Sequence, residues 1–417
     1  MIARWLDQRE RIDGLLDSLP STLAGSERAR CQHLVFGVVR HYGRIDASLA
    51  RLVAHPPRFS TRAVLFIAGF ELIEAVGSAP EEGLVAKIVH HAVEQTKTLA
   101  SPAEARLVNA VVRKLAVAMA TPAPAKPASA EILAEYFSHP AWLVERWLAQ
   151  FGAESTRQLL EWNQQPAKVY ARWRAPAEIP PSFLNKTEWD SFFEVTAGNW
   201  RDVEILLKAG KLYLQDPGTR LAIELLDPKP GETVLDLCAA PGGKSLLIAD
   251  RMKTGRLVAI DLPSPRIDRL KENMAKIEGV EVALVQHDLL TYSGRELRTD
   301  HALPEVYDAV LIDVPCSNTG VMRHRADVKW RLQSTDFSKH AAQQLALLHM
   351  AARLVRPGGR MVYSTCSIDP QENDGVVKAF FESRAGGPFT LVQSKVNFPW
   401  QAGHDGGGTF LLSNTLK

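Results

Sequence analysis

Residues 233–245 read TVLDLCAAPGGKS, and this stretch decides the fold of the chain. Thr233 to Leu237 form a short apolar run rich in strand-forming residues, and the segment KSLLIADRM (244–252) has helical apolar spacing. Small residues and one proline lie between them, so the pattern predicts a strand, a glycine-rich turn and a helix. In an open α/β sheet such a turn lies at the carboxyl end of a strand, where ligands bind. Glycine there lets the backbone approach a ligand that a Cβ would exclude.

The spacing in this turn excludes two phosphate-binding motifs. A Walker A loop needs a glycine five residues before its GK[ST] element, and that position is Cys238. The GxGxxG dinucleotide fingerprint is absent as well. A tight turn without any ligand is the alternative for this stretch alone. However, Asp261, Asp288 and Asp313 end later predicted strands at βαβ intervals, which favours a ligand site at this edge of the sheet.

Three motifs identify the family that the chain resembles: LDLCAAPGGKS (235–245), DVPCSNTG (313–320) and YSTCSIDPQEN (363–373). With them, residues 210–385 resemble the Nop2/Sun family of RNA cytosine-5 methyltransferases, and within it the RsmB-like bacterial group that acts on 16S ribosomal RNA. The resemblance implies a C-terminal α/β, Rossmann-like methyltransferase domain with a mostly parallel sheet. It also implies S-adenosyl-L-methionine as the cofactor and RNA as the partner.

Length and composition set limits on the class of protein. A chain of 417 residues is expected to form two or three domains. No apolar run approaches the roughly 20 residues of a membrane span, and the charged start MIARWLDQRE lacks a signal-peptide core. The four cysteines are far apart and form no CxxC pair, which argues against a zinc site or disulfides and for a cytoplasmic protein. We expect no metal and no membrane, and a monomer.

The first 120 residues show helical spacing of apolar residues throughout. Between Arg28 and Arg62 there are seven arginines and one acid, Asp46, so this face is either an ordinary solvated helix surface or a surface for RNA phosphates. The region resembles the all-α NusB-like RNA-binding domain that precedes the catalytic part in the matched group. A Pro/Ala-rich linker, TPAPAKPASA (121–130), follows it. We therefore expect an RNA-binding domain over residues 1–125.

The rest of the chain is expected to form a small α+β, RNA-recognition-like module (131–210) and the catalytic domain (211–417). Six of the nine tryptophans lie between Trp142 and Trp200, where they either form the core or stack on bases. The catalytic domain alternates predicted strands with helices, which indicates a mostly parallel sheet. Its end, DGGGTFLLSNTLK, departs from the family pattern, so the sequence does not decide whether it forms a last strand. The predicted strands are 233–237, 257–261, 282–286, 309–313 and 360–364.

Methylation of cytosine at C5 requires a nucleophile, because that carbon is unreactive until a thiolate adds to C6. Two cysteines, Cys316 and Cys366, follow strand ends in tight turns. A buried and inert cysteine is the common alternative. The sequence alone does not decide which of the two cysteines is the nucleophile. By resemblance, Cys366 is the nucleophile and Cys316 is linked to product release. The positive surroundings that a thiolate needs are expected from Lys244, Arg323, His324 and Arg325.

The remaining site residues follow strand order. Asp313 is expected to lie beneath the base. The alternative is that its carboxylate only caps the next turn. Asp261 is expected to hold the ribose hydroxyls, Asp288 to meet the adenine amine, and Arg266 to match a family arginine. The loop expected to surround the methionine part of the cofactor comprises Cys238, Ala239, Ala240, Pro241, Gly242, Gly243 and Lys244.

The segment 321–331 follows the Pro-Cys motif and is rich in basic residues. Arg323, Arg325, Lys329 and Arg331 accompany one acid, Asp327. The segment is either an ordinary exposed loop or, beside the active centre, a contact for the RNA backbone.

Two alternatives to this function remain at this point. One is the same chemistry on transfer RNA or at another ribosomal site. The other is an RNA-binding or antitermination factor without catalysis, against which Lys244, Asp313, Cys316 and Cys366 argue because all four are intact.

Overall fold

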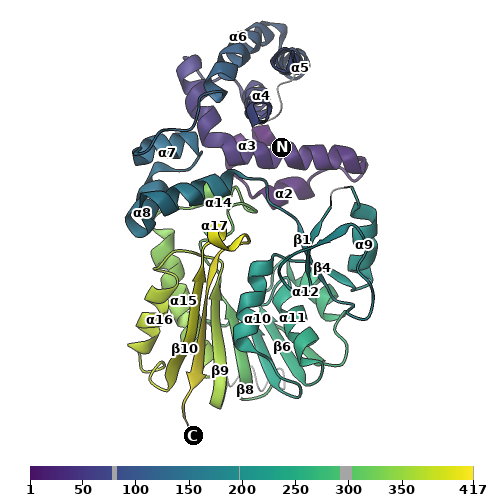
Figure 1. The fold of residues 1–417 in the computed structure, drawn as a ribbon, viewed down its shortest axis with the longest axis vertical. Coiled ribbons are helices and arrows are strands. Elements are labelled where there is room, and N and C mark those ends of the chain that lie inside the picture. The colour runs from purple at the N-terminus through teal and green to yellow at the C-terminus, as the bar shows by residue number, and fades with distance from the viewer. Residues whose placement is uncertain (78–81, 197, 292–302, 417) are drawn as a thin grey trace. The chain divides into compact units, whose positions relative to one another are not determined.

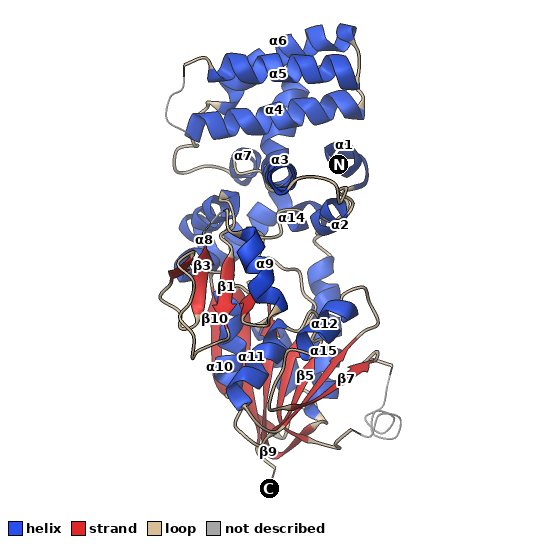
Figure 2. Cartoon of the chain, turned by 90° about the vertical axis from the view of Figure 1, so that its right-hand side faces the viewer, coloured by secondary structure: helices blue, strands red, loops and turns tan. Residues whose placement is uncertain are grey.

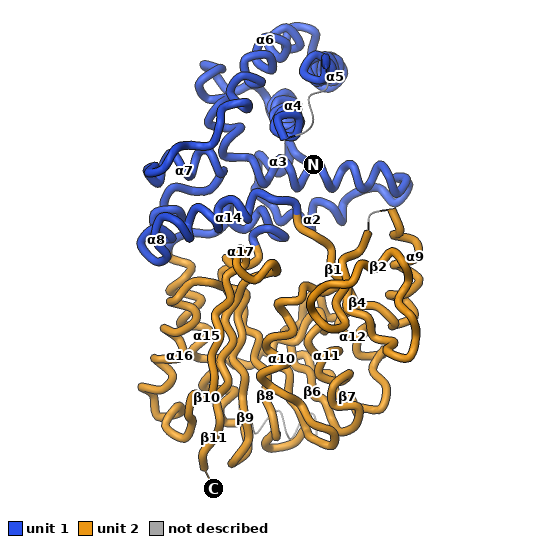
Figure 3. The backbone as a smooth tube through the Cα atoms, in the orientation of Figure 1, with its two compact units in different colours: residues 1–166, 322–334 blue, residues 167–321, 335–417 orange. Residues whose placement is uncertain are grey.

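The computed structural model describes residues 1–77, 82–196, 198–291 and 303–416. Its contacts divide the chain into two compact units (Figure 3). Unit 1 comprises residues 1–166 and 322–334, and unit 2 comprises residues 167–321 and 335–417. The expected domain boundaries at 125, 131 and 211 follow sequence patterns rather than contacts, and they stay a prediction. Among the described residues, no helix has the length and apolar character needed to cross a membrane.

Unit 1 is helical, as expected. Figure 2 shows α4, α5 and α6 packed side by side, and their apolar faces share one core with α1 and α3. Helix α6 begins with Pro102 after Ser101, whose hydroxyl accepts a hydrogen bond from the Glu104 amide. The helices are α1 (Ile2–Gln8), α2 (Ile12–Asp17), α3 (Gly25–Leu52), α4 (Phe59–Gly77), α5 (Leu84–Leu99), α6 (Pro102–Met119), α7 (Ala130–Tyr136), α8 (Ala141–Gln164) and α14 (Val328–Arg331).

The arginine-rich face of α3 and α4 is largely neutralised. Acids from distant parts of unit 1 pair with several of its arginines, and Arg40 is buried. The sequence count of seven arginines against one acid therefore overstates the free positive charge. An RNA-binding role for this face stays a prediction. The ion pairs are Arg30–Glu71, Arg51–Glu135, Arg58–Glu104 and Arg62–Asp46.

The basic segment after the Pro-Cys motif is not an ordinary exposed loop, which was one of its two interpretations. Lys329 is only 1% exposed, and its Nζ donates to the Arg40 carbonyl at 2.9 Å. The Arg40 guanidinium in turn donates to the Arg323 carbonyl at 3.0 Å, and Arg323 is buried too. Burial, reinforced by the charge of Arg40, lowers the pKa of Lys329 well below its usual value. Lys329 and Arg323 are therefore unavailable for RNA contact, whereas Arg325 is exposed.

Unit 2 begins with a small antiparallel sheet of order β2-β3-β1-β4. Alternate residues of β1 face opposite sides. Ala171 and Trp173 pack with Val203 of α9, and Arg172 reaches Asp250 of α11 (Gly243–Met252) from the other face. Trp173 is thus a core residue, as is Trp147 in unit 1, whereas Trp200 is exposed. The elements are β1 (Tyr170–Trp173), β2 (Leu184–Lys186), β3 (Phe192–Val195), α9 (Trp200–Lys208) and β4 (Leu212–Leu214).

The main sheet of unit 2 has seven strands in the order β10-β11-β9-β8-β5-β6-β7. Strands β5 to β9 pair in parallel, and β10 and β11 add antiparallel strands at one edge. The order reverses direction between β5 and β8, so their carboxyl ends form the switch point where ligands bind in such sheets. The strands are β5 (Thr233–Leu237), β6 (Arg256–Asp261), β7 (Glu281–Gln286), β8 (Tyr307–Asp313), β9 (Val355–Thr365), β10 (Phe389–Asn397) and β11 (Gly407–Asn414).

Helices cover both faces of this sheet (Figure 1). Leu235 and Leu237 of β5 pack with α15 and α16, whereas Val234 packs with α10 and α11 on the other face. The strands are therefore apolar on both sides, as parallel strands buried between helices are. The helices are η1 (Pro217–Thr219), α10 (Arg220–Leu226), α11 (Gly243–Met252), α12 (Ile267–Met274), α15 (Asp336–Ala352), α16 (Asp374–Phe381) and α17 (Pro399–Ala402).

These elements confirm the expected fold class and the five predicted strands. The sequence did not decide whether the C-terminal tail forms a strand, and in the structure it forms β11. The three glycines 406–408 explain the unusual composition, because a Cβ at Gly406 would lie 2.9 Å from the Asn397 carbonyl oxygen, and one at Gly407 would lie 2.3 Å from that of Thr365. Glycine is needed where the tail passes this close to neighbouring backbone.

Candidate active site

The glycine-rich turn after β5 is held in one conformation by its neighbours. Cys238 and Gly242 have positive φ angles of 61° and 101°, and a Cβ on Gly242 would lie 2.9 Å from Leu270. The Ala240 amide donates to the Asp261 carboxylate at 2.7 Å, and the Asn273 side chain donates to the Pro241 carbonyl at 2.7 Å. The turn is therefore fixed in advance, with the first amides of α11 at its end.

The other expected cofactor residues lie around this turn. Asp261 is buried at the end of β6 and uses one carboxylate oxygen to hold the turn. Asp288 follows β7, and its carboxylate accepts from the Leu290 amide at 2.9 Å. Arg266 is exposed at the start of α12. Burial raises the pKa of the Cys238 thiol, and the charge of Arg266 only partly opposes this rise. The structure brings Asp261 into the turn, whereas no hydrogen bond or ion pair joins Asp288 to the turn among the described residues.

Lys244 and Asp313 form an ion pair across the switch point. The Lys244 Nζ lies 2.6 Å from Asp313 Oδ2, and both side chains are mostly buried. Burial alone would lower the pKa of Lys244, but the charge of Asp313 outweighs it and the pKa is raised. The second oxygen, Asp313 Oδ1, is buried and has no hydrogen-bond partner among the described residues. A buried acceptor without a donor is costly. A polar group of a substrate that donates a hydrogen bond to this oxygen would offset that cost.

Asp236 lies beneath the same turn, wholly buried in β5. Its Oδ2 accepts from the Ser245 hydroxyl, and its Oδ1 has no partner among the residues described. Burial is the main cause that raises the pKa of Asp236 to about 7, and the nearby Asp313 charge adds to it. The centre therefore contains a carboxyl group that titrates near neutral pH, which is common at functional sites.

The two candidate cysteines lie close together. Asp313 of β8 is paired with Ser364 of β9, so the loops that carry Cys316 and Cys366 leave the sheet side by side. A hydrogen bond from the Cys316 thiol is the main cause that lowers the pKa of Cys366; burial opposes it and Lys244 assists it. The same bond, with burial, raises the pKa of Cys316 well above its usual value. These opposite pKa shifts favour Cys366 as the thiolate and Cys316 as the thiol.

A buried carboxylate joins the two cysteine loops, and the sequence interpretation gave it no role. Glu372 Oε1 accepts from the Ser317 amide at 2.9 Å and from Gln344 Nε2 at 3.0 Å. Its Oε2 accepts from the hydroxyls of Ser317 and Ser367, the latter at 2.6 Å. Ser317 and Ser367 directly follow the two cysteines, so Glu372 fixes the distance between them. The only signal for it in the sequence was its place in the PQEN part of the third motif.

A backbone contact holds the cysteine loops from the other side. The Gly320 amide donates to the Cys366 carbonyl at 3.0 Å, and the Gly406 amide donates to the Gly320 carbonyl at 2.9 Å. A Cβ on Gly320 would lie 2.3 Å from the Gly406 carbonyl oxygen. The glycine of the DVPCSNTG motif is therefore required by this close packing.

Together these residues can perform covalent chemistry on a planar, polar group. The favoured thiolate, Cys366, has a thiol beside it, and a carboxylate with one free oxygen lies on the neighbouring strand end. The fixed turn at the carboxyl end of β5 provides a place for a second ligand.

The chain is similar to known ribosomal RNA methyltransferases over most of its length. The family model described as "16S rRNA methyltransferase RsmB/F" matches residues 223–404, and the model described as "NusB family" matches residues 1–117. Ribosomal RNA small subunit methyltransferase B of Sodalis glossinidius is 30% identical over 404 residues, which cover 94% of this chain and 89% of that protein. The protein of the same name from Serratia proteamaculans is 28% identical and covers 92% of this chain and 89% of its own length.

Solved structures are similar as well. The crystal structure of PH0851 superposes with a TM-score of 0.74 at 23% identity, covering 94% of this chain and 91% of that one. NSun6 from Pyrococcus horikoshii with SFG has a TM-score of 0.53 at 17% identity, covering 67% of this chain and 99% of that one. At these identities the similarity concerns the fold.

Proposed function

Because the chain belongs to the RsmB/F family of 16S rRNA methyltransferases, we propose that it methylates C5 of a cytosine in 16S ribosomal RNA. The methyl donor is S-adenosylmethionine, and the reaction proceeds through a covalent bond between Cys366 and C6 of the base. The observation that supports this proposal is the placement of Cys316 and Cys366 just after the paired ends of β8 and β9, at the edge where Lys244 and Asp313 form an ion pair. A hydrogen bond from Cys316 lowers the pKa of Cys366, which agrees with the need for a thiolate.

The residues around the β5 turn fit S-adenosylmethionine. The space beside Gly242 admits no side chain. Asp261 ends β6 and Asp288 follows β7, in the places where such folds bind ribose and base. Cys238 to Lys244, with Arg266 and Asp313 nearby, complete the proposed binding set. When bound, the cofactor supplies an electrophilic methyl group on its sulfonium.

The protein side of the reaction follows from the geometry. The Cys366 thiolate adds to C6 of the cytosine, and the electron pair moves onto C5 and N3. Asp313 Oδ1, which lacks a partner among the described residues, accepts from the exocyclic amine and so orients the base, while Lys244 holds the carboxylate in place. After C5 is methylated, a base takes the C5 proton, the electron pair of that C–H bond re-forms the C5=C6 double bond, and Cys366 leaves as a thiolate. The Asp313 carboxylate is the base that this site supplies, and Cys316 is assigned, by resemblance, to assist the release.

Two cysteine variants test the proposal with opposite outcomes. Cys366→Ala should abolish methylation and leave no covalent RNA adduct. Cys316→Ala should attack and transfer the methyl group but release slowly, so a denaturation-resistant protein–RNA complex should accumulate in the presence of S-adenosylmethionine. Cys31→Ala is the matched control, because Cys31 lies in α3 of unit 1, and it should behave as the wild type.

Gel electrophoresis after denaturation distinguishes the outcomes. An adduct with Cys366→Ala and none with Cys316→Ala would reverse the two roles. Full activity of both variants, without any adduct, would refute covalent catalysis. We propose a cytoplasmic monomer that binds RNA without a metal, and transfer RNA is the alternative substrate that the same assay examines.

A further inference from the structure

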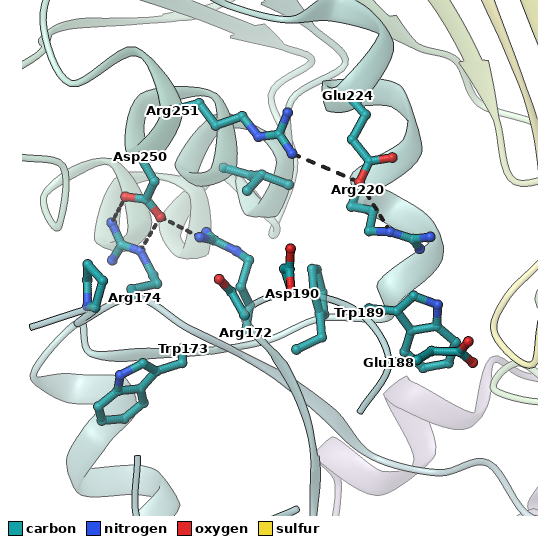
Figure 4. A pocket seen from close by; sticks show the side chains of 14 residues that line it. Arg172, Trp173, Arg174, Glu188, Trp189, Asp190, Arg220, Glu224, Asp250 and Arg251 are labelled. Carbon is teal, nitrogen blue, oxygen red and sulfur yellow. Dashed lines mark hydrogen bonds and ion pairs between the residues drawn. The ribbon is translucent and has the colours of Figure 1, made fainter. Parts of the chain in front are cut away.

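A cavity lies in unit 2 beside the C-terminal half of α11. It has a volume of about 500 Å³ and lies between the small sheet, with the loop 188–192, and the helices α10 and α11 (Figure 4). Leu247, Asp250 and Arg251 of α11 line it, whereas the residues of the proposed cofactor turn do not. The cavity is large enough for one nucleotide and too small for a duplex.

The helix side of this cavity is positively charged. Arg172 and Arg174 both pair with the single carboxylate of Asp250, and Arg220 and Arg251 share Glu224, at 3.2 and 4.0 Å. On this wall four guanidinium groups therefore face two carboxylates, which leaves an excess of positive charge.

Arg172 lacks one of the hydrogen bonds that it can make. It is only 3% exposed, and its Nε and Nη1 donate to Gln215 and Asp250. Its Nη2 is buried without a partner among the described residues. Burial lowers the pKa of Arg172 even though Asp250 opposes that effect. A buried guanidinium nitrogen without an acceptor is costly, and an acceptor atom of a ligand would offset that cost.

The loop side of the cavity carries the opposite charge and an aromatic ring. Glu188 and Asp190 are exposed, and neither has an ion-pair partner among the described residues. Between them, Trp189 is held edge to face by Tyr170 at 5.7 Å and by His404 at 5.4 Å, with the Arg220 guanidinium 5.9 Å from its centroid. The indole is thus half-buried and fixed in position before any ligand binds.

Few ligands match an arginine wall, a free carboxylate and an indole within one nucleotide's volume. Arginine recognises O6 and N7 of guanine, and aromatic side chains stack on unpaired bases of RNA. A carboxylate needs two adjacent N–H donors for a bidentate bond, and guanine is the only common base whose Watson–Crick edge offers them, at N1 and N2. Uracil would place carbonyl oxygens against the carboxylate.

We propose that this cavity binds one unpaired guanosine of the RNA substrate, with Trp189 stacking on the base, Asp190 accepting from its N1 and N2 and the arginines facing its O6 and N7. The proposal rests on RNA being the substrate class. It adds a recognition site away from the reacting cysteine, on the face of the small sheet that packs against α11.

The test uses the full-length protein and two single-stranded RNA hexamers, U6 and U6 with one central guanosine. Fluorescence anisotropy should show about tenfold tighter binding of the guanosine hexamer, as expected for one stacked and hydrogen-bonded base. Trp189→Ala and Asp190→Asn should each remove this preference. Trp200→Ala is the matched control, because Trp200 is exposed on α9 and does not line the cavity, and it should keep the preference.

Several results would overturn the proposal: failure of the wild type to bind the guanosine hexamer, equal affinity for both hexamers, or an unchanged preference in Trp189→Ala. Calorimetry with S-adenosylmethionine checks that each variant is folded, and crosslinking of 6-thioguanosine RNA to the peptide that contains residues 187–192 supports the assignment independently. If the wild type methylates 16S RNA and Trp189→Ala does so with the same KM, the cavity is not a substrate site although the proposed function stands. If the wild type fails to methylate, the proposed function itself fails.

Discussion

Replacing Glu372 by glutamine should loosen the link between the two cysteine loops. The carboxylate accepts four hydrogen bonds, two at Oε1 from N–H groups and two at Oε2 from serine hydroxyls. In Glu372→Gln the amide oxygen must face the N–H donors, so the NH2 group faces the hydroxyls of Ser317 and Ser367, and those two bonds are reversed or lost. A hydrogen bond to a charged group contributes about 1.5–3 kcal/mol and a neutral one about 1 kcal/mol. The free energy of unfolding should therefore fall by about 2–4 kcal/mol.

The substitution should also change the chemistry of the cysteines. The charge of Glu372 contributes to the raised pKa of Cys316, so its removal should lower that pKa and allow alkylation of Cys316 at lower pH. Urea denaturation measures the stability change, and mass spectrometry after iodoacetamide treatment over a pH series measures the reactivity of each cysteine.

Glu382→Gln provides the control for both measurements. Glu382 is exposed directly after α16, and its substitution should change stability by no more than about 0.5 kcal/mol. The reasoning would be refuted if Glu372→Gln unfolded like this control and if the alkylation profiles of Cys316 and Cys366 were the same as in the wild type.

Two further predictions concern the aspartates of the site. Burial raises the pKa of Asp236 from 3.8 to about 7, so the folded protein retains a proton that the unfolded chain releases, and stability should fall as pH rises through this window, by about 4 kcal/mol at 1.36 kcal/mol per pH unit. Urea denaturation at pH 4 and pH 8 should show that fall in the free energy of unfolding of the wild type and not in that of Asp236→Asn. An equal change between the two pH values in both proteins would contradict the assignment. Asp261→Ala removes the acceptor of the Ala240 amide and should weaken S-adenosylmethionine binding by about 1–3 kcal/mol; unchanged affinity by calorimetry would count against Asp261.

The sequence predicted those parts of the molecule in which local pattern determines structure. The glycine-rich turn, the aspartates at strand ends and the placement of Cys316 and Cys366 at neighbouring strand ends follow from apolar periodicity and from the order of a parallel sheet. Such features involve residues close in the chain, or positions that the strand order fixes.

The sequence did not predict features that depend on partners distant in the chain. The arginines of α3 and α4 looked free because their partners Glu71, Glu104 and Glu135 lie outside that stretch. The burial of Lys329 against Arg40 joins residues 289 positions apart, and no local pattern marks such a contact. Glu372 shows the same limit, because its four donors come from three separate segments.

The central claim, methylation of cytosine C5 in 16S ribosomal RNA, is tested most directly by the product. Purified protein is incubated with unmodified 16S RNA and S-adenosylmethionine carrying a labelled methyl group, and the RNA is digested to nucleosides for mass spectrometry, with bisulfite sequencing to locate the site. We predict labelled 5-methylcytidine at one cytosine, and none with Cys366→Ala. Label in N4-methylcytidine or in a ribose methyl group, or 5-methylcytidine formed at the wild-type rate by Cys366→Ala, would contradict the account.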